Sequence, residues 1–136
     1  MDVRFPFENS GEMQFGTIYR PVAKASFQSP TTKKWVDIWM IVDTGADYTI
    51  LPRFFADKLR VSFERDCVKD TTSGVGGITS VYFLKYKLLV RIGSFERNVP
   101  LAFFDNNEVP ALLGRIGFLE TFDTEFLKRR AVVFND

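Results

Sequence analysis

The tripeptide Asp43-Thr44-Gly45 sets a carboxylate, a hydroxyl and a glycine in succession, directly after an apolar run that begins at Trp35. A carboxylate at the end of a strand can act as a general acid or base if neighbouring donors hold its orientation. Thr44 offers a hydroxyl and a backbone N–H, and Gly45 lets the chain turn tightly without a Cβ clash. These features make Asp43 a candidate catalytic residue. The other interpretation is an ordinary turn at the end of a strand.

Composition narrows the chemistry that this residue could perform. The sequence has no histidine, which removes imidazole-based serine and cysteine triads and most catalytic zinc sites. Acid–base work therefore falls to carboxylates, Lys or Tyr. Eighteen Lys and Arg against seventeen Asp and Glu leave a net charge of +1, so no global field attracts nucleic acid or an anionic membrane.

Cys67 is the single cysteine, which excludes an intramolecular disulfide and fits a reducing compartment. We expect it to be a small buried apolar residue. The N-terminal segment lacks the apolar core of a signal peptide, and no stretch is long enough to span a bilayer. These features predict a cytoplasmic protein without a membrane partner.

Short runs of β-branched and aromatic residues, separated by turn formers, predict a mostly β fold with one or two short helices. The predicted strands are 19–27, 35–42, 48–51, 79–92 and 99–104, followed by a compact apolar run at 111–113 and a C-terminal hairpin around Phe126 and 131–134. In the long strand 79–92, apolar side chains at even positions from Tyr82 to Ile92 share one face. The predicted helices are 53–59, which Pro52 can open, and 117–122.

The length of 136 residues suits one domain over 1–136. We expect an N-terminal extension of about 1–16, a core of about 17–122, and C-terminal strands of about 123–136.

Two further segments contain glycine in patterns that suit a site. Gly74, Gly76 and Gly77 permit a tight, mobile hairpin tip that could cover a substrate, or form an ordinary exposed turn. Leu112-Leu113-Gly114 could pack apolar side chains behind the Asp43 loop, with Gly114 allowing close backbone contact, or could be a plain core strand that ends in a turn.

The stretch from Val42 to Asp47 closely resembles the active-site motif of retropepsins, the single-domain aspartic proteases of retroviruses and their cellular and prokaryotic relatives. The segment 73–78 is similar to their glycine-rich flap tip. The segment 111–115 resembles the apolar pair and glycine that precede their C-terminal helix. These landmarks occur in the family's order, and the resemblance implies a closed, β-barrel-like acid-protease fold.

The resemblance also assigns roles to individual positions and implies no metal and no cofactor. Asp47 is expected to pair with Arg115, which directly follows the glycine. The catalytic loop residues would be Asp43, Thr44 and Gly45; substrate-binding residues would be Ala46, Asp47, Gly74, Val75, Gly76 and Gly77; structural support would come from Leu112, Leu113, Gly114 and Arg115.

Aspartic proteases use two carboxylates that share a proton, whereas Asp-Thr-Gly occurs once here. The expected enzyme is therefore a homodimeric aspartic endopeptidase that cleaves polypeptides with one Asp43 from each subunit. The alternatives are a non-catalytic dimeric binding or scaffold module of the same fold, and an unrelated small barrel that holds an apolar ligand.

Viral members interleave short terminal strands, but here both ends are longer. The tail 126–134 could join the dimer interface or close the subunit's own sheet.

Overall fold

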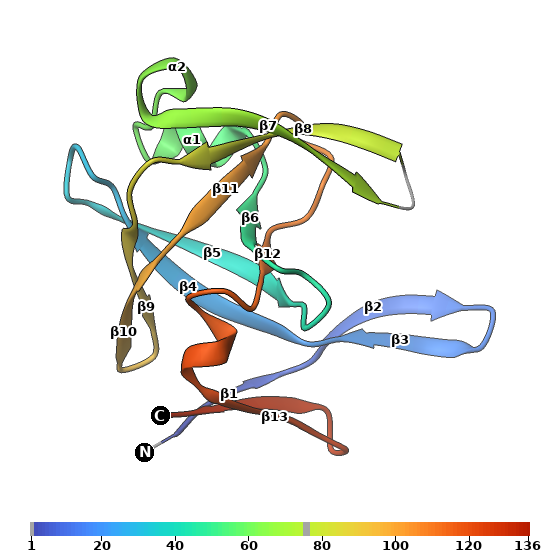
Figure 1. Ribbon diagram of the computed structural model, residues 1–136. Coiled ribbons are helices and arrows are strands. Elements are labelled where there is room, and N and C mark those ends of the chain that lie inside the picture. Colours follow the sequence, from blue (N-terminus) through green and yellow to red (C-terminus); the bar gives the residue numbers. More distant parts are fainter. Residues whose placement is uncertain (1, 75–76) are drawn as a thin grey trace.

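The structure is a computed structural model that describes residues 2–74 and 77–136. In these residues strands predominate and the helices are short (Figure 1). The strands are β1 (Asp2–Pro6), β2 (Glu8–Met13), β3 (Gly16–Arg20), β4 (Val22–Gln28), β5 (Trp35–Val42), β6 (Thr49–Leu51), β7 (Cys67–Gly74), β8 (Gly77–Leu84), β9 (Leu88–Ile92), β10 (Phe95–Val99), β11 (Leu101–Phe104), β12 (Leu112–Leu113), β13 (Asp123–Leu127) and β14 (Ala131–Asn135). The helices are α1 (Phe54–Lys58), α2 (Phe63–Asp66) and the 3-10 turn η1 (Leu119–Thr121).

A nine-stranded sheet in the order β10-β9-β4-β5-β12-β6-β11-β8-β7 forms the body of the molecule. The predicted hairpin of β4 and β5 is confirmed by antiparallel pairing from Val22↔Ile41 to Gln28↔Trp35. The short strand β12 lies between β5, to which it is parallel, and β6, to which it is antiparallel. Among the described residues none of the sheets closes on itself, so the mostly β prediction is confirmed but the predicted barrel closure is not.

Three predicted strands are interrupted, and each break has a local cause. The predicted strand 19–27 is divided into β3 and β4 at Pro21, and 99–104 into β10 and β11 at Pro100, because proline has no N–H for the ladder. The predicted strand 79–92 was also wrong: it bends at 85–87, where the N–H of Lys85 donates to the carbonyl of Asp66 at 2.8 Å. β8 and β9 therefore pair with different neighbours.

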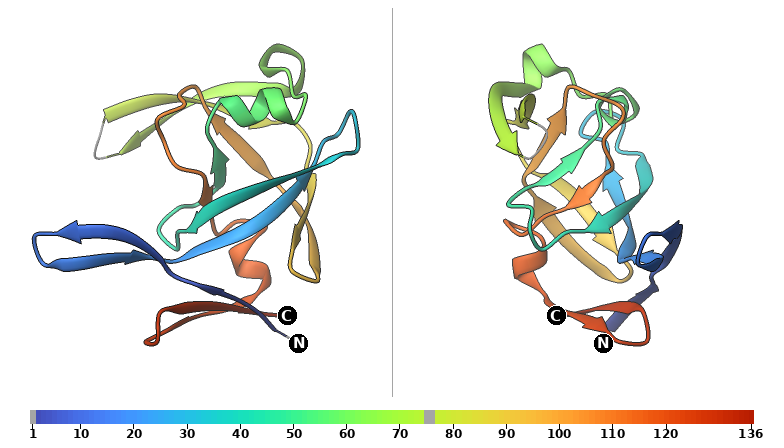
Figure 2. Two further views of the ribbon diagram at one scale, coloured as in Figure 1. Left: turned by 180° about the vertical axis from the view of Figure 1, so that it is seen from behind. Right: turned by 90° about the vertical axis from the view of Figure 1, so that its right-hand side faces the viewer.

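Both ends of the chain belong to a separate three-stranded sheet in the order β1-β14-β13. β14 pairs antiparallel with β1 on one side and with β13 on the other. The predicted C-terminal hairpin is thus confirmed, whereas β1 and β2 were not predicted. The two termini lie side by side (Figures 1 and 2). The tail therefore closes the subunit's own sheet, the second of the two arrangements considered for it.

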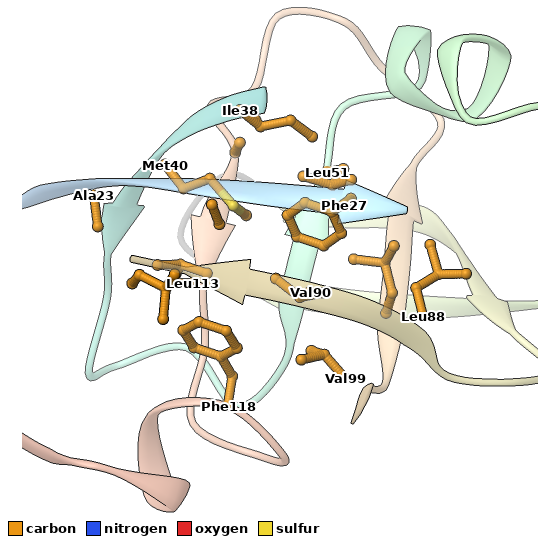
Figure 3. Close-up of a cluster of buried hydrophobic side chains, with 14 of the residues drawn as sticks. Ala23, Phe27, Ile38, Met40, Leu51, Leu88, Val90, Val99, Leu113 and Phe118 are labelled. Carbon is orange, nitrogen blue, oxygen red and sulfur yellow. The ribbon is translucent and has the colours of Figure 1, made fainter. Parts of the chain in front are cut away.

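The hydrophobic core is formed by side chains from the strands of the large sheet and includes side chains of the three-stranded sheet. Side chains from β4, β5, β9 and β12 converge on it together with Phe118 (Figure 3). Phe134 of β14 is fully buried in the same cluster, so the small sheet packs on the body. α1 contributes the buried Ala56 and confirms the helix predicted at 53–59, while the helix predicted at 117–122 is reduced to the single turn η1.

Candidate active site

Asp43 follows the last residue of β5 and forms hydrogen bonds with the backbone of β12 and with the backbone of the loop that follows it. Its N–H donates to the carbonyl of Leu113 at 3.0 Å, which continues the parallel pairing of β5 and β12. Its carboxylate Oδ1 accepts the N–H of Gly45 at 2.9 Å, and its carbonyl accepts the N–H of Ala46 at 3.2 Å. The side chain is half-buried, so a preorganised carboxylate remains accessible at the surface.

The segment after β12 holds the rest of this loop. The N–H of Arg115 donates to the carbonyl of Ala46 at 3.0 Å, and that of Ile116 donates to the carbonyl of Asp47 at 2.9 Å. The N–H of Gly114 donates to the buried hydroxyl of Thr49 at 3.1 Å. The structure therefore brings 43–47 and 112–115 together, and the loop 43–48 has little freedom to move away from β12.

The apolar pair before Gly114 lies behind the loop. Leu113 is fully buried in the core cluster, and Leu112 is half-buried opposite Ile41 and Ile50. The side chains of this pair thus fill the space under the loop while their backbone carries the hydrogen bonds.

Asp47 and Arg115 form an ion pair between Oδ1 and the guanidinium. The partnership that the resemblance implied is present. Both side chains are exposed, at 62% for Asp47 and 50% for Arg115. One guanidinium nitrogen makes the contact, so the pair in this chain is neither buried nor bidentate.

Beside the loop 43–48 is a hollow of about 510 Å³ that extends to β13. Thr44 forms its border on the loop side, and Phe126 forms its border on β13. Ile116 and Phe126 are exposed at 43% and 44%. Its lining residues are Thr44, Arg115, Ile116, Leu119, Glu120, Phe122, Thr124 and Phe126. Ile116 and Phe126 were not predicted as site residues, because nothing in the local pattern distinguishes a residue that faces a hollow from one that faces the core.

The glycine-rich segment lies at the end of the β7–β8 hairpin. Gly74 is the last residue of β7 and pairs with Gly77, the first residue of β8. Val75 and Gly76, two of the predicted substrate-binding residues, lie outside the described residues. The hairpin extends from the body on the same side as the loop 43–48 (Figures 1 and 2). The ring of Tyr48 meets that of Phe83 on β8 edge-on at 5.2 Å, which connects the loop to the base of the hairpin.

Residues 2–74 and 77–136 contain no group of three or more Cys, Asp or Glu placed to hold a metal ion. The same residues include no helix of sufficient length and apolar character to cross a membrane.

A family model for aspartyl proteases matches residues 32–115, which is more than half of the chain, so the chain belongs to the aspartyl protease family. Among solved structures, it is similar to the crystal structure of a retropepsin-like aspartic protease from Rickettsia conorii. The TM-score is 0.64 and the identity 20%, over 98% of this chain and 98% of that one. The fold is therefore retropepsin-like. No curated protein matches the sequence.

Proposed function

We propose that the protein is an aspartic endopeptidase whose catalytic dyad consists of Asp43 from each of two identical subunits. The observation that supports this most directly is the hydrogen bond from the N–H of Gly45 to Oδ1 of Asp43, in a loop fixed to β12. A carboxylate oriented in this way, at the surface of a chain of the aspartyl protease family, has the chemistry that a protease-type function requires.

The dyad is proposed because one carboxylate cannot both activate water and donate a proton to the peptide carbonyl. Asp-Thr-Gly occurs once in the sequence, so the second carboxylate comes from a second copy related by a two-fold axis close to Asp43. The pair holds a water, which attacks the scissile carbonyl. The departing nitrogen is then protonated, with no covalent intermediate. Because the dyad must share one proton, cleavage is expected to favour acidic conditions.

The neighbouring groups have distinct roles in this proposal. Thr44 is exposed beside Asp43 and supports the loops across the two-fold axis. The backbone at Gly45 and Asp47 offers hydrogen-bonding groups to an extended substrate, and Ala46 lines its path. The segment 74–77 of the β7–β8 hairpin covers the substrate from the other side and adds backbone hydrogen bonds.

The decisive experiment measures cleavage of a peptide library from about pH 3 to pH 7 by the native chain and by Asp43→Asn. We expect the variant to lose activity by about 10³-fold or more with unchanged thermal stability. Asp37→Asn is the matched control, because Asp37 is an exposed carboxylate on the same strand. If Asp43→Asn cleaves as well as the native chain, Asp43 is not catalytic. A non-catalytic binding module would bind peptides and cleave none.

Mixing the native chain with Asp43→Asn tests whether the site is shared. With random exchange of subunits at equal amounts, about one quarter of the dimers carry two intact Asp43 residues, so activity per native chain falls by about half. If each subunit worked alone, activity per native chain would stay constant, and the shared dyad would be excluded.

A further inference from the structure

The hairpin of β2 and β3, residues 8–20, projects from the body and is called the arm below. It forms a two-stranded sheet of its own, and within the described residues neither strand pairs with a third. Figure 1 shows it extending away from the rest of the molecule. No residue of the arm is buried. A two-stranded hairpin without a covering surface is at best marginally stable in water, so this segment is expected to pack against something.

The tip of the arm is apolar. Phe15 is 99% exposed and Met13 is 57% exposed, and the tight turn at 14–15, between β2 and β3, places both at the end of the hairpin. Gly16 makes this turn with φ +118°. A fully exposed phenylalanine contributes nothing to the stability of the subunit. Its exposure suits contact with another surface.

The base of the arm, unlike its tip, is fixed to the body by hydrogen bonds and a ring contact. It lies next to β5, the strand that ends before Asp43. The carbonyl of Pro21 accepts the N–H of Val42 at 2.8 Å, one residue before Asp43. The guanidinium of Arg130 stacks on the ring of Tyr19 at 3.9 Å, and the carbonyl of Arg130 accepts the N–H of Phe7 at 2.9 Å. The arm therefore leaves the body beside Asp43, in a direction that the fold determines.

The arm projects on the side of the molecule where a second subunit is needed to complete the proposed pair of Asp43 carboxylates. The arm and the β7–β8 hairpin both project on the side of the loop 43–48, with the loop between them, in Figure 1 and in the left-hand view of Figure 2. A second copy that brings its own Asp43 to this loop would approach from this side and meet the arm.

The C-terminal strand β14 is not available for an interleaved contact of the kind viral members use, because it already has β1 on one side and β13 on the other. A stable interface needs about 800 Å² and about 20–30 residues from each partner. The hollow beside Thr44 has eight lining residues, which is too few by itself. The thirteen residues 8–20 of the arm raise the total to about twenty, the lower end of that range.

We propose that the arm is a dimerisation device that extends over a second copy of this chain and packs Phe15 and Met13 against it. The proposal rests on the proposed function for the position of the two-fold axis. By symmetry each dimer contains two such contacts, one made by the arm of each subunit. The partner surface covers the apolar tip and the free edges of the hairpin, and the arm brings the two Asp43 residues together without touching the substrate.

Phe15→Ser tests the proposal with little risk to the fold, since the side chain is 99% exposed in the subunit. We expect the dimer dissociation constant, measured by sedimentation over a range of concentrations, to rise by about tenfold or more, with unchanged thermal unfolding of the monomer. Tyr86→Ser is the control, because Tyr86 is an exposed aromatic residue at the 85–87 bend, outside the arm. Equal dimerisation by the native chain and Phe15→Ser overturns the proposal.

Cross-linking locates the contact directly. Phe15→Cys carries a benzophenone maleimide at the arm tip, while the natural Cys67 is buried. After a 1:1 mixture of unlabelled and ¹⁵N-labelled protein is irradiated, we expect cross-linked peptides that join the two isotopic forms. Cross-links confined to one chain overturn the proposal.

These results are separable from those of the peptidase test. A dimer that Phe15→Ser weakens, but that cleaves no peptide, supports the arm and contradicts the enzyme. Cleavage that depends on Asp43 in a dimer unaffected by Phe15→Ser contradicts the arm and leaves the enzyme intact.

Discussion

The backbone of Gly114 lies directly against the carbonyl of Tyr48, so that a Cβ on Gly114 would overlap the carbonyl oxygen. The same Cβ would also come within 2.8 Å of the backbone nitrogen of Thr49. These are backbone atoms on both sides and cannot swing aside as the end of a flexible side chain could. The close approach is what allows β12 and the following residues to hydrogen-bond to the loop 43–48.

Gly114→Ala is therefore expected to destabilise the protein by about 2–3 kcal/mol, because either the loop or β12 must shift. Denaturant unfolding measures the change. Gly45→Ala is the matched control: a Cβ there would lie 3.3 Å from Oδ1 of Asp43 and meet no backbone atom. We expect Gly45→Ala to leave stability within about 0.5–1 kcal/mol of the native value but to lower cleavage by about tenfold or more, since it displaces the carboxylate. Equal stability losses in the two variants would contradict this account.

The ion pair between Asp47 and Arg115 is expected to matter little for the stability of the subunit. Both side chains are at least half exposed, and exposed pairs contribute about 0–1 kcal/mol. Arg115→Gln should therefore change the free energy of unfolding by less than about 1 kcal/mol. Glu96→Gln, which breaks the comparably exposed pair with Arg91, is the control. If the loop position at Asp47 serves substrate binding, only Arg115→Gln lowers kcat/KM. A large stability loss from Arg115→Gln would show that the pair is buried in the working protein.

The parts of the site that could be predicted from sequence are those determined by local patterns. The apolar run 35–42 ending at Asp43 forms β5, and the apolar pair 112–113 lies behind the loop, both as predicted from the local pattern. The parallel pairing of β12 with β5 was not predicted. The Asp47–Arg115 contact was predictable because the resemblance to retropepsins implies it. Its exposure was not, because burial depends on which elements pack around the pair.

The errors have a common physical origin in long-range contacts. The alternation in 79–92 predicted one strand, and Leu88, Val90 and Ile92 are indeed buried, but a hydrogen bond from Lys85 to Asp66 bends the chain before them. β1 is a strand because it pairs with β14 at the other end of the chain, a contact that no local pattern reveals. The arm was missed for the opposite reason, since its short polar strands carry no buried face.

Cys67 should be nearly inert in the folded protein. It is 7% exposed, and burial, with the nearby charge of Asp66, raises the pKa of its thiol to about 11. At pH 8 we expect iodoacetamide to modify the native chain about 100-fold more slowly than the chain in denaturant, because the thiolate is the reactive form. Mass spectrometry follows the reaction. Comparable rates in the two conditions would mean that this part of the core opens readily.

The carboxyl of Asp66 links the stability of the fold to pH. Hydrogen bonds from the Arg65 guanidinium, at 3.0 and 3.1 Å, and from the N–H of Ser62, at 2.8 Å, hold its pKa below the ordinary value of 3.8. A carboxyl with a lowered pKa in the folded state stabilises that state above pH 3.8, and this contribution is lost as the pH falls through the folded-state pKa.

Asp66→Asn should therefore cost about 1 kcal/mol at neutral pH, where the ionised carboxylate is bonded, and progressively less below pH 3.8. Calorimetric unfolding from about pH 2 to pH 7 measures the two curves, and they should converge at the acidic end. Asp57→Asn, an exposed carboxylate on α1, is the control and should follow the native curve throughout. A gap between native protein and Asp66→Asn that stayed constant with pH would contradict the linkage. The convergence also bears on the proposed dyad, because the acidic conditions in which cleavage is expected are those in which the Asp66 carboxylate no longer stabilises the fold.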